Sequence, residues 1–260
     1  MLTEETPHRK TNALPRLVAS VLALTSIPFA AIAQEQPQGF SIGVGVAGGS
    51  GLYVGEDADA MALPLLRYDS DAFSIGVPDG LRVTLFDRND FRLSAVIAPR
   101  FSEIDASDAP ELDGLDRELT ADGGFQAIYR LGDLTILRFQ AVTELTDKHG
   151  GSELSLGLSH AIPLGRVPLL LEGGVTWQSE GLSSYLYGVS ASEATGARPA
   201  YSPGDVVVPH FSVGTAIPVA RNTRLIVNIR ADFLPDEVSS SPIVDEDVTL
   251  RGFFGITHNF

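Results

Sequence analysis

The sequence predicts an all-β fold: a transmembrane, antiparallel, up-and-down β-barrel of about twelve strands, with ten as the alternative, after a cleaved signal peptide. Three observations support this prediction. Most segments alternate between apolar and polar residues, which is the period of a strand. They run about 10–12 residues, where soluble strands average about 5–6. Every second connection between them is short, as in barrels with short periplasmic turns and longer outer loops.

The last eleven residues show the alternation most clearly. One face carries Leu250, Phe254, Ile256 and Phe260, and the sequence ends at the aromatic residue Phe260. The length fits a tilted membrane-spanning strand of about 9–11 residues. We therefore expect Phe254, Ile256 and Phe260 to lie on the strand that closes the barrel against the first strand. The alternative is the edge strand of a soluble sandwich.

The first 33 residues have the organisation of a secretory signal peptide. Basic residues at positions 9, 10 and 16 precede an apolar run over 17–33, and Ala31-Ile32-Ala33 forms a cleavage site before Gln34. The run is short for a membrane-spanning helix of about 20 residues, and Pro28 interrupts it. We expect residues 1–33 to be the signal peptide and residues 34–260 to be an outer-membrane barrel domain.

Twelve strands follow from the alternation and the turn residues. Positions 62–86 are the weakest part, because three short strands there could be two longer ones. The expected strands are 38–48, 62–68, 71–77, 80–86, 91–101, 119–130, 134–145, 152–162, 167–178, 205–217, 223–233 and 249–260.

The charge of the chain is strongly negative, at −15 formally and −16 once the signal peptide is removed. Nucleic-acid binders are basic, so that class is excluded. Negative charge is concentrated in the long links 49–61, 102–118 and 234–248. We interpret them as solvated loops, with cation bridging to lipopolysaccharide phosphates as the alternative. No calcium-loop pattern is present, the chain has no cysteine, and no metal site or cofactor is expected.

The polar faces of several strands carry full charges. In a membrane barrel this face lines the lumen, where the charges either select ions in a channel or fill a narrow barrel with salt bridges. Barrels of about 8 strands are filled by side chains and those of 16–18 strands leave a channel, so we expect a closed or nearly closed lumen. The candidate lumen charges are Arg92, Arg138, Glu144, Glu172, Arg224, Arg230 and Asp232.

Aromatic residues gather near the long link 179–204, namely Trp177, Tyr185, Tyr187 and Tyr201. They could form a ligand platform. We favour an aromatic girdle at the outer rim, where amphipathic rings lie at headgroup level.

An enzyme is not expected. The mature chain has four histidines and many serines, but no G-x-S-x-G motif. His258 lies near the periplasmic end of the lipid-facing side, where a polar group is least unfavourable.

Four segments resemble the MltA-interacting protein/OmpV (MipA/OmpV) family of Gram-negative outer-membrane proteins. They cover the mature chain in order, and none is strong alone. They are 43–55, which ends Tyr53-Val54-Gly55; Pro64-Leu65-Leu66-Arg67-Tyr68; Tyr185-Leu186-Tyr187-Gly188-Val189 followed by Glu193-Ala194 and Tyr201; and Ser241-Pro242-Ile243-Val244. Gly51 stands where the family has a proline, and Leu186-Tyr187 where it has paired tyrosines.

The resemblance implies an outer-membrane barrel and gives no catalytic residues to assign to positions of this chain. The family is best known for a scaffold that brings a lytic transglycosylase to a murein synthase, and other members are adhesins or affect antibiotic entry. We therefore expect location in the outer membrane, with lipid, lipopolysaccharide and the barrel-assembly machinery as partners. The expected function is docking of periplasmic murein enzymes. A narrow solute channel, or adhesion through the acidic loops, is the alternative.

Overall fold

The computed structural model describes residues 38–101, 104, 109–115 and 117–260. The expected signal peptide lies outside the described residues, as do Glu103, Asp105, Asp108 and Asp116 of the long acidic links.

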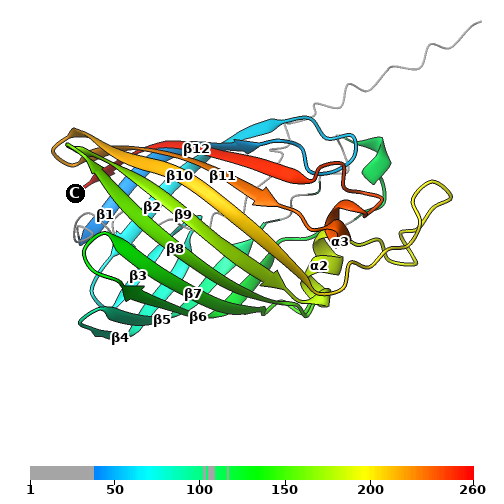
Figure 1. The fold of residues 1–260 in the computed structure, drawn as a ribbon, viewed down its shortest axis with the longest axis horizontal. Helices are drawn as coiled ribbons and strands as arrows, with labels where there is room; N and C mark the ends of the chain where they lie inside the picture. The colour runs from blue at the N-terminus through cyan, green and yellow to red at the C-terminus, as the bar shows by residue number, and fades with distance from the viewer. Residues whose placement is uncertain (1–37, 102–103, 105–108, 116) are drawn as a thin grey trace, which may run out of the picture.

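Twelve antiparallel strands form one closed barrel in sequential order, with β1 paired to β12 (Figure 1). The predicted barrel is confirmed, and the ten-strand alternative is wrong because β2, β3 and β4 are separate strands. The strands are β1 (Gly39–Gly49), β2 (Asp59–Asp69), β3 (Phe73–Val77), β4 (Gly80–Arg88), β5 (Phe91–Arg100), β6 (Thr120–Arg130), β7 (Thr135–Glu144), β8 (Ser152–Leu164), β9 (Val167–Gln178), β10 (Val206–Ala220), β11 (Thr223–Phe233) and β12 (Val248–Asn259).

The alternation places apolar side chains on the outside of the barrel. On β8, Leu154, Leu156 and Leu158 are each more than 40 % exposed, whereas Glu153 and Ser159 are buried. Since the apolar face is the solvent-exposed one, the surroundings of the wall must be lipid. The inside-out pattern excludes the soluble sandwich.

The first and last strands close the barrel in a continuous register from Ser41 opposite Asn259 to Gly49 opposite Arg251. At the end of this seam the backbone N–H of Phe260 donates a hydrogen bond of 2.9 Å to the carbonyl oxygen of Phe40. The two rings lie on the outside with centroids 6.0 Å apart.

Links at the two ends of the barrel differ in length. On the side of the C-terminus they are tight turns between successive strands. At the opposite end the long links fold into the 3-10 helix η1 (Pro110–Leu112) and the helices α2 (Glu180–Tyr187) and α3 (Asp236–Ser239) (Figure 1). The two-residue link between β3 and β4 is an exception, because it turns before the outer end, where β2 and β5 extend beyond it. None of the described helices is long and apolar enough to cross a membrane.

Candidate functional site: the lumen, the outer cap and the periplasmic rim

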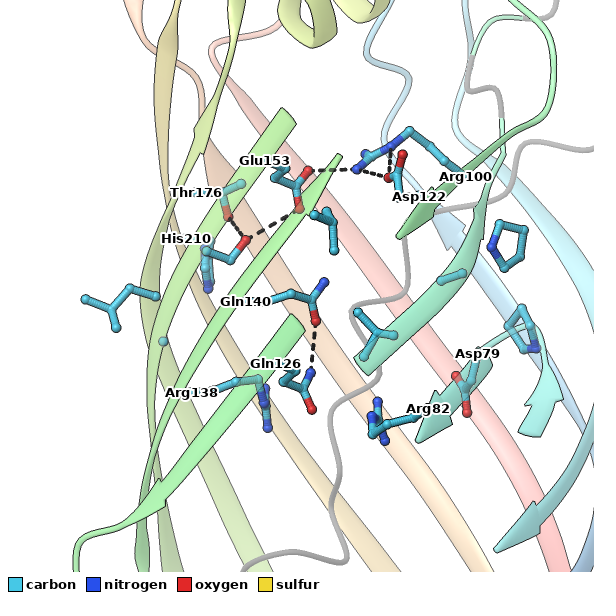
Figure 2. A pocket seen from close by; sticks show the side chains of 18 of the residues that line it. Asp79, Arg82, Arg100, Asp122, Gln126, Arg138, Gln140, Glu153, Thr176 and His210 are labelled. Atoms are coloured by element: carbon cyan, nitrogen blue, oxygen red, sulfur yellow. Dashed lines mark hydrogen bonds and ion pairs between the residues drawn. The ribbon is translucent and has the colours of Figure 1, made fainter. Parts of the chain in front are cut away.

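Ion pairs connect strands across the lumen. Arg100 on β5 lies 2.6 Å from Asp122 on β6 and 3.0 Å from Glu153 on β8 (Figure 2). Below them, Gln126 donates a hydrogen bond of 2.9 Å to Gln140. The side chains of Arg100 and its two acids are each about one-tenth exposed, so the pairs fill the interior.

A second group surrounds Glu172 on β9, whose side chain is 4 % exposed. Arg138 lies 3.3 Å from one carboxylate oxygen, which also accepts a 2.6 Å hydrogen bond from the Ser159 hydroxyl. His210 Nε2 is 3.8 Å from the other oxygen. The Ser159 hydroxyl thus donates to the glutamate, and the group is held together by the charge of Glu172.

A third group is centred on Asp232 of β11, which lies 2.7 Å from both Arg230 and Arg251. These three groups contain four of the seven candidate lumen charges, namely Arg138, Glu172, Arg230 and Asp232. Arg251, Arg100, Asp122 and Glu153 belong to the same interior but were not among the predicted residues. Their positions on polar faces of the expected strands would have identified them.

The remaining three candidates lie at the ends of strands. Arg92 pairs at 2.6 Å with Asp87 beside a periplasmic turn, and both side chains are more than one-third exposed. Arg224 is at the periplasmic end of β11. Glu144 lies at the outer end of β7, where its carboxylate accepts hydrogen bonds from the backbone N–H groups of Thr146, Lys148, His149 and Gly150. Glu144 therefore holds an outer turn.

Among these groups lies a cavity with a volume of about 120 Å³, which is large enough for several water molecules. Towards the periplasm, inward-facing Ile136, Ala161 and Leu170 are buried against one another, with Ile128 packed on them. The described residues thus fill the interior at two levels.

The long outer links close the outer end as a folded cap, formed by residues 50–58, 109–115, 117–119, 179–205 and 234–247. Its apolar side chains pack together with two residues at the top of β10 to form a core. The buried members are Leu52, Tyr53, Ala109, Leu112, Leu115, Tyr187, Val189, Val206, Val208, Val238, Ile243 and Val244. Acids such as Asp57, Glu237 and Asp245 remain on the outside. These acids are solvated, as predicted for the loops. The apolar core that the same links form beneath them was not predicted.

Two buried arginines connect different links of the cap. Arg198 donates hydrogen bonds of 2.7 and 3.0 Å to the carbonyl oxygens of Glu111 and Asp113. Arg117 donates to the Gly188 carbonyl at 3.0 Å and pairs with Glu193 at 2.5 Å. Burial raises the pKa of Glu193, but the hydrogen bonds from Arg117 and Ser190 and the charge of Arg117 together outweigh it and leave that pKa below its ordinary value. Neither arginine is among the site residues predicted from the sequence, although they are the only basic residues in the four long links.

The girdle prediction is wrong for the tyrosines of link 179–204. Tyr187 is 7 % exposed within the cap core. Tyr201 packs on the same core and its hydroxyl donates to the Glu237 carbonyl at 2.7 Å. Tyr185 stacks on His149 at 4.8 Å. Trp177 alone lies on the strand face that points to lipid, beside outward-facing Leu154 and Val207.

Outward-facing aromatic rings occur instead near the periplasmic ends of the strands. They lie in pairs with centroids 5.7 and 5.9 Å apart, Tyr68 with Phe73 and Phe86 with Phe91. Outward-facing aromatic pairs thus occur at the periplasmic ends of β2 to β5, on the side opposite to the one expected.

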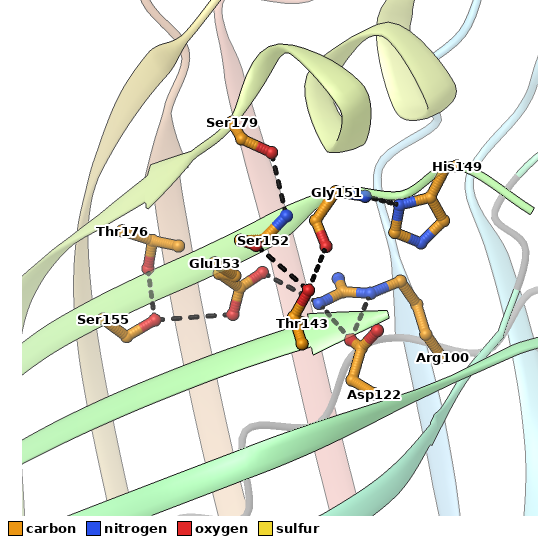
Figure 3. Close-up of polar contacts among 10 residues, drawn as sticks. All are labelled: Arg100, Asp122, Thr143, His149, Gly151, Ser152, Glu153, Ser155, Thr176 and Ser179. Carbon is orange, nitrogen blue, oxygen red and sulfur yellow. Dashed lines mark hydrogen bonds and ion pairs between the residues drawn. The ribbon is translucent and has the colours of Figure 1, made fainter. Parts of the chain in front are cut away.

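The cap continues into the lumen through short polar contacts. The Ser152 N–H donates a 2.8 Å hydrogen bond to the Ser179 hydroxyl ahead of α2. The Thr143 hydroxyl donates to the Gly151 carbonyl at 3.2 Å, and the Gly151 N–H donates to His149 Nδ1 at 3.0 Å. Figure 3 shows these contacts above the pairs of Arg100.

The periplasmic rim carries exposed arginines at four positions, namely Arg88, Arg130, Arg166 and Arg221. The turns of Arg166 and Arg221 contain no acid, whereas Asp71, Asp90 and Asp133 lie in the other three turns. One side of the rim is therefore basic, in contrast to the acidic outer cap.

The described residues contain no cluster of three or more His, Asp or Glu side chains placed to hold a metal ion. His160 and His258 lie on the lipid-facing side near the periplasm, where Thr135 and Thr223 are 2.9 Å from their Nδ1 atoms.

A closed barrel with an apolar exterior, a polar filled interior and long links at one end only defines an outer-membrane β-barrel protein. The family model described as "MltA-interacting protein MipA" matches residues 42–260. The chain belongs to this family, as its resemblance to the family predicts.

Curated relatives agree with this assignment. The chain is 28 % identical over 244 residues to the "Putative outer membrane protein YiaT" of Escherichia coli K12, covering 93 % of this chain and 98 % of that one. It is 26 % identical to the "MltA-interacting protein" of the same strain, covering 95 % and 99 %. It is 25 % identical to "Outer membrane protein OmpV" of Vibrio cholerae, covering 78 % and 79 %. The protein is located in the outer membrane.

Three of the four segments that resemble the family meet in the cap. Tyr53 forms an isolated bridge with Val244, and Val189 forms another with Tyr201. The Ser241 hydroxyl donates to the Tyr187 carbonyl at 2.6 Å. The fourth segment, 64–68, lies on β2.

Proposed function

We propose that this barrel is a non-enzymatic, non-conducting docking protein that holds murein-remodelling enzymes at the inner face of the outer membrane. The observation that supports the proposal is the set of buried ion pairs across the lumen, centred on Arg100, Glu172 and Asp232. Because these pairs obstruct the interior, we assign the functional surface to the rims.

The partner class comes from the relative named for its interaction with MltA. The candidate docking surface is the basic side of the periplasmic rim, around Arg166 and Arg221. A rim built of short turns is small, and charge complementarity would then supply both the association rate and the specificity. An acidic surface on a lytic transglycosylase or a murein synthase would suit it.

The test is binding of a purified lytic transglycosylase of the MltA type, and of a bifunctional murein synthase, to the immobilised barrel in detergent. We expect retention of at least one of them, and binding about threefold to tenfold weaker for the double variant R166S/R221S, since an exposed charge pair contributes about 0.2–1 kcal/mol. The control D245S/D247S changes two exposed acids of the outer cap and should bind normally. An intact barrel that retains neither enzyme would overturn the proposal.

Conductance in planar bilayers tests the non-conducting part separately. We expect no open-channel current from the folded barrel. A stable current of the size that porins give would replace docking with the channel alternative.

The folded cap supports a second candidate, surface adhesion. Its exposed acids lie on a rigid framework and so offer a defined surface for recognition. Deleting residues 181–200 would remove α2 and part of the core, so the sharper test is replacement of exposed acids. Cell binding unchanged in D57S/E237S/D245S would exclude these acids from adhesion.

A further inference from the structure

The wall of the barrel is incomplete beside the β3–β4 hairpin. Pairing between β2 and β3 ends at Leu66 opposite Val77, and pairing between β4 and β5 ends at Leu81 opposite Ile97. Residues 59–65 of β2 and 98–100 of β5 extend beyond the hairpin. On this side, no described strand pairs with either segment. We call the space between these segments the wall gap.

The sequence at the wall gap suits strands with one unpaired side. Unpaired backbone groups are unfavourable in lipid by several kcal/mol each, and proline lacks the N–H that would be left without a partner. Pro64 lies on the extended part of β2, Pro99 on that of β5, and Pro78 at the hairpin tip. The gap is thus a built feature of the sequence.

One aromatic ring covers the gap from inside. Phe101, directly after β5, packs with Met61 against the buried pair of Ala47 and Leu63. Phe253 joins the same cluster from β12. Phe101 therefore lies between the wall gap and the lumen.

Outside the gap is an apolar groove with a volume of about 650 Å³. Outward-facing Leu66, Ile75, Val77 and Ile97 line it, and it extends to Leu119 and Thr146 near the outer rim. Leu81, Ala98 and Pro99 line both this groove and the lumen cavity. Ala98 belongs to the inward face of β5, since it lies opposite Asp122 of the lumen. The groove consequently penetrates the wall as far as an inward-facing residue.

We propose that the groove binds one acyl chain of an outer-membrane lipid, inserted through the wall gap as far as Ala98 and stopped by Phe101. The groove opens within the lipid-facing belt, so its surroundings supply acyl chains. Its lining is almost entirely apolar, which suits a hydrocarbon chain and not a headgroup. This site differs from the docking rim and does not depend on the proposed function.

Photochemical labelling can distinguish an inserted chain from the lipid that surrounds any barrel. The barrel is reconstituted in dioleoylphosphatidylcholine vesicles with phosphatidylethanolamine bearing a diazirine on one acyl chain, and adducts are located by residue-resolved mass spectrometry. We expect adducts on Ala98 as well as on outward-facing Ile97. Ser94 is the internal control, because it is inward-facing on the same strand where β4 completes the wall. It should carry none.

A larger side chain on the groove lining should exclude the acyl chain, and the same substitution elsewhere on the strand is the control. Ala121 lies on the groove lining, so Ala121→Phe should lower the adduct yield on Ala98 at least threefold. Ala127→Phe changes an outward-facing alanine of the same strand away from the groove and should leave the yield unchanged. A heat-modifiable gel band shows that each variant is folded.

The proposal is overturned if adducts occur on outward-facing residues around the barrel but not on Ala98. It is also overturned if Ala121→Phe and Ala127→Phe give the wild-type yield there. In either case the lipid contacts the wall only from outside.

Discussion

The Tyr53 hydroxyl donates a 3.1 Å hydrogen bond to the backbone carbonyl of Leu186, 133 positions further along the chain. Tyr53 belongs to the link after β1 and Leu186 to helix α2. The ring of Tyr53 is 2 % exposed, so the bond lies inside the cap. The outer links thus fold as one unit, and the cap is as much a structural element as the barrel.

Arg198→Met should loosen the cap without opening the barrel. The substitution removes three donor contacts, to the carbonyl oxygens of Glu111, Asp113 and Glu193, and hydrogen bonds from charged groups contribute about 1.5–3 kcal/mol. Limited proteolysis should cleave the links 109–119 and 189–205 at least tenfold faster. The heat-modifiable band should persist.

Arg221→Met is the control for this measurement, because Arg221 is an exposed arginine of a periplasmic turn. Cleavage of the cap at the wild-type rate in Arg198→Met would mean that the apolar core alone holds the links together.

Acidification should weaken the cap through His149. Burial lowers the pKa of His149 below its ordinary value of 6.5, and the charge of Arg100 lowers it further. The charges of Glu144 and Asp122 raise this pKa but do not outweigh the burial. Its Nδ1 accepts the Gly151 N–H, a bond that the imidazolium cannot make. Since the folded pKa lies below the unfolded one, this stabilisation is complete above about pH 6.5 and is lost as the pH falls through the folded pKa.

The measurement is the proteolysis rate of the cap between pH 8 and pH 5, with an acid-tolerant protease. The wild type should be cleaved faster as the pH falls. The variant His149→Phe keeps the stacking on Tyr185 but has no titratable ring, so its cleavage rate should depend less on pH. Equal pH profiles for the two proteins would remove His149 as the cause.

Much of this fold could be predicted from the sequence, because each membrane-spanning strand is recognisable from its own residues, by their alternation and by the length of the segment. The bounds of β9 and β11 are those expected from the sequence. The cap could not be predicted in this way. Its contacts join residues such as Tyr53 and Val244 that are far apart in the chain, and its links have no regular period. Tyr187 was consequently expected at the lipid interface, although it lies in the cap core.

Glu172→Gln should destabilise the barrel by about 3–5 kcal/mol, because it leaves the Arg138 guanidinium uncompensated in a buried site. Arg138 is 3.3 Å from Glu172, and their side chains are 12 % and 4 % exposed. Urea unfolding in detergent micelles, followed by the heat-modifiable band, measures the change. The double variant R138M/E172Q should be more stable than the sum of the two single changes predicts. Additive losses would show that the two groups do not interact.

The seam between β1 and β12 allows a sharp test with a single methyl group. A Cβ added at Gly43 would lie 2.3 Å from the backbone carbonyl oxygen of Ile256, whereas the nearest atom to one at Gly252 is the Gly48 carbonyl oxygen at 3.9 Å. Backbone cannot move aside as a flexible side chain can, and overpacking typically costs about 1–3 kcal/mol. Gly43→Ala should therefore slow refolding into vesicles and lower the urea midpoint, while Gly252→Ala on the same seam should refold as the wild type does. If the two variants behave alike, close approach of the backbones at Gly43 does not limit closure of the barrel.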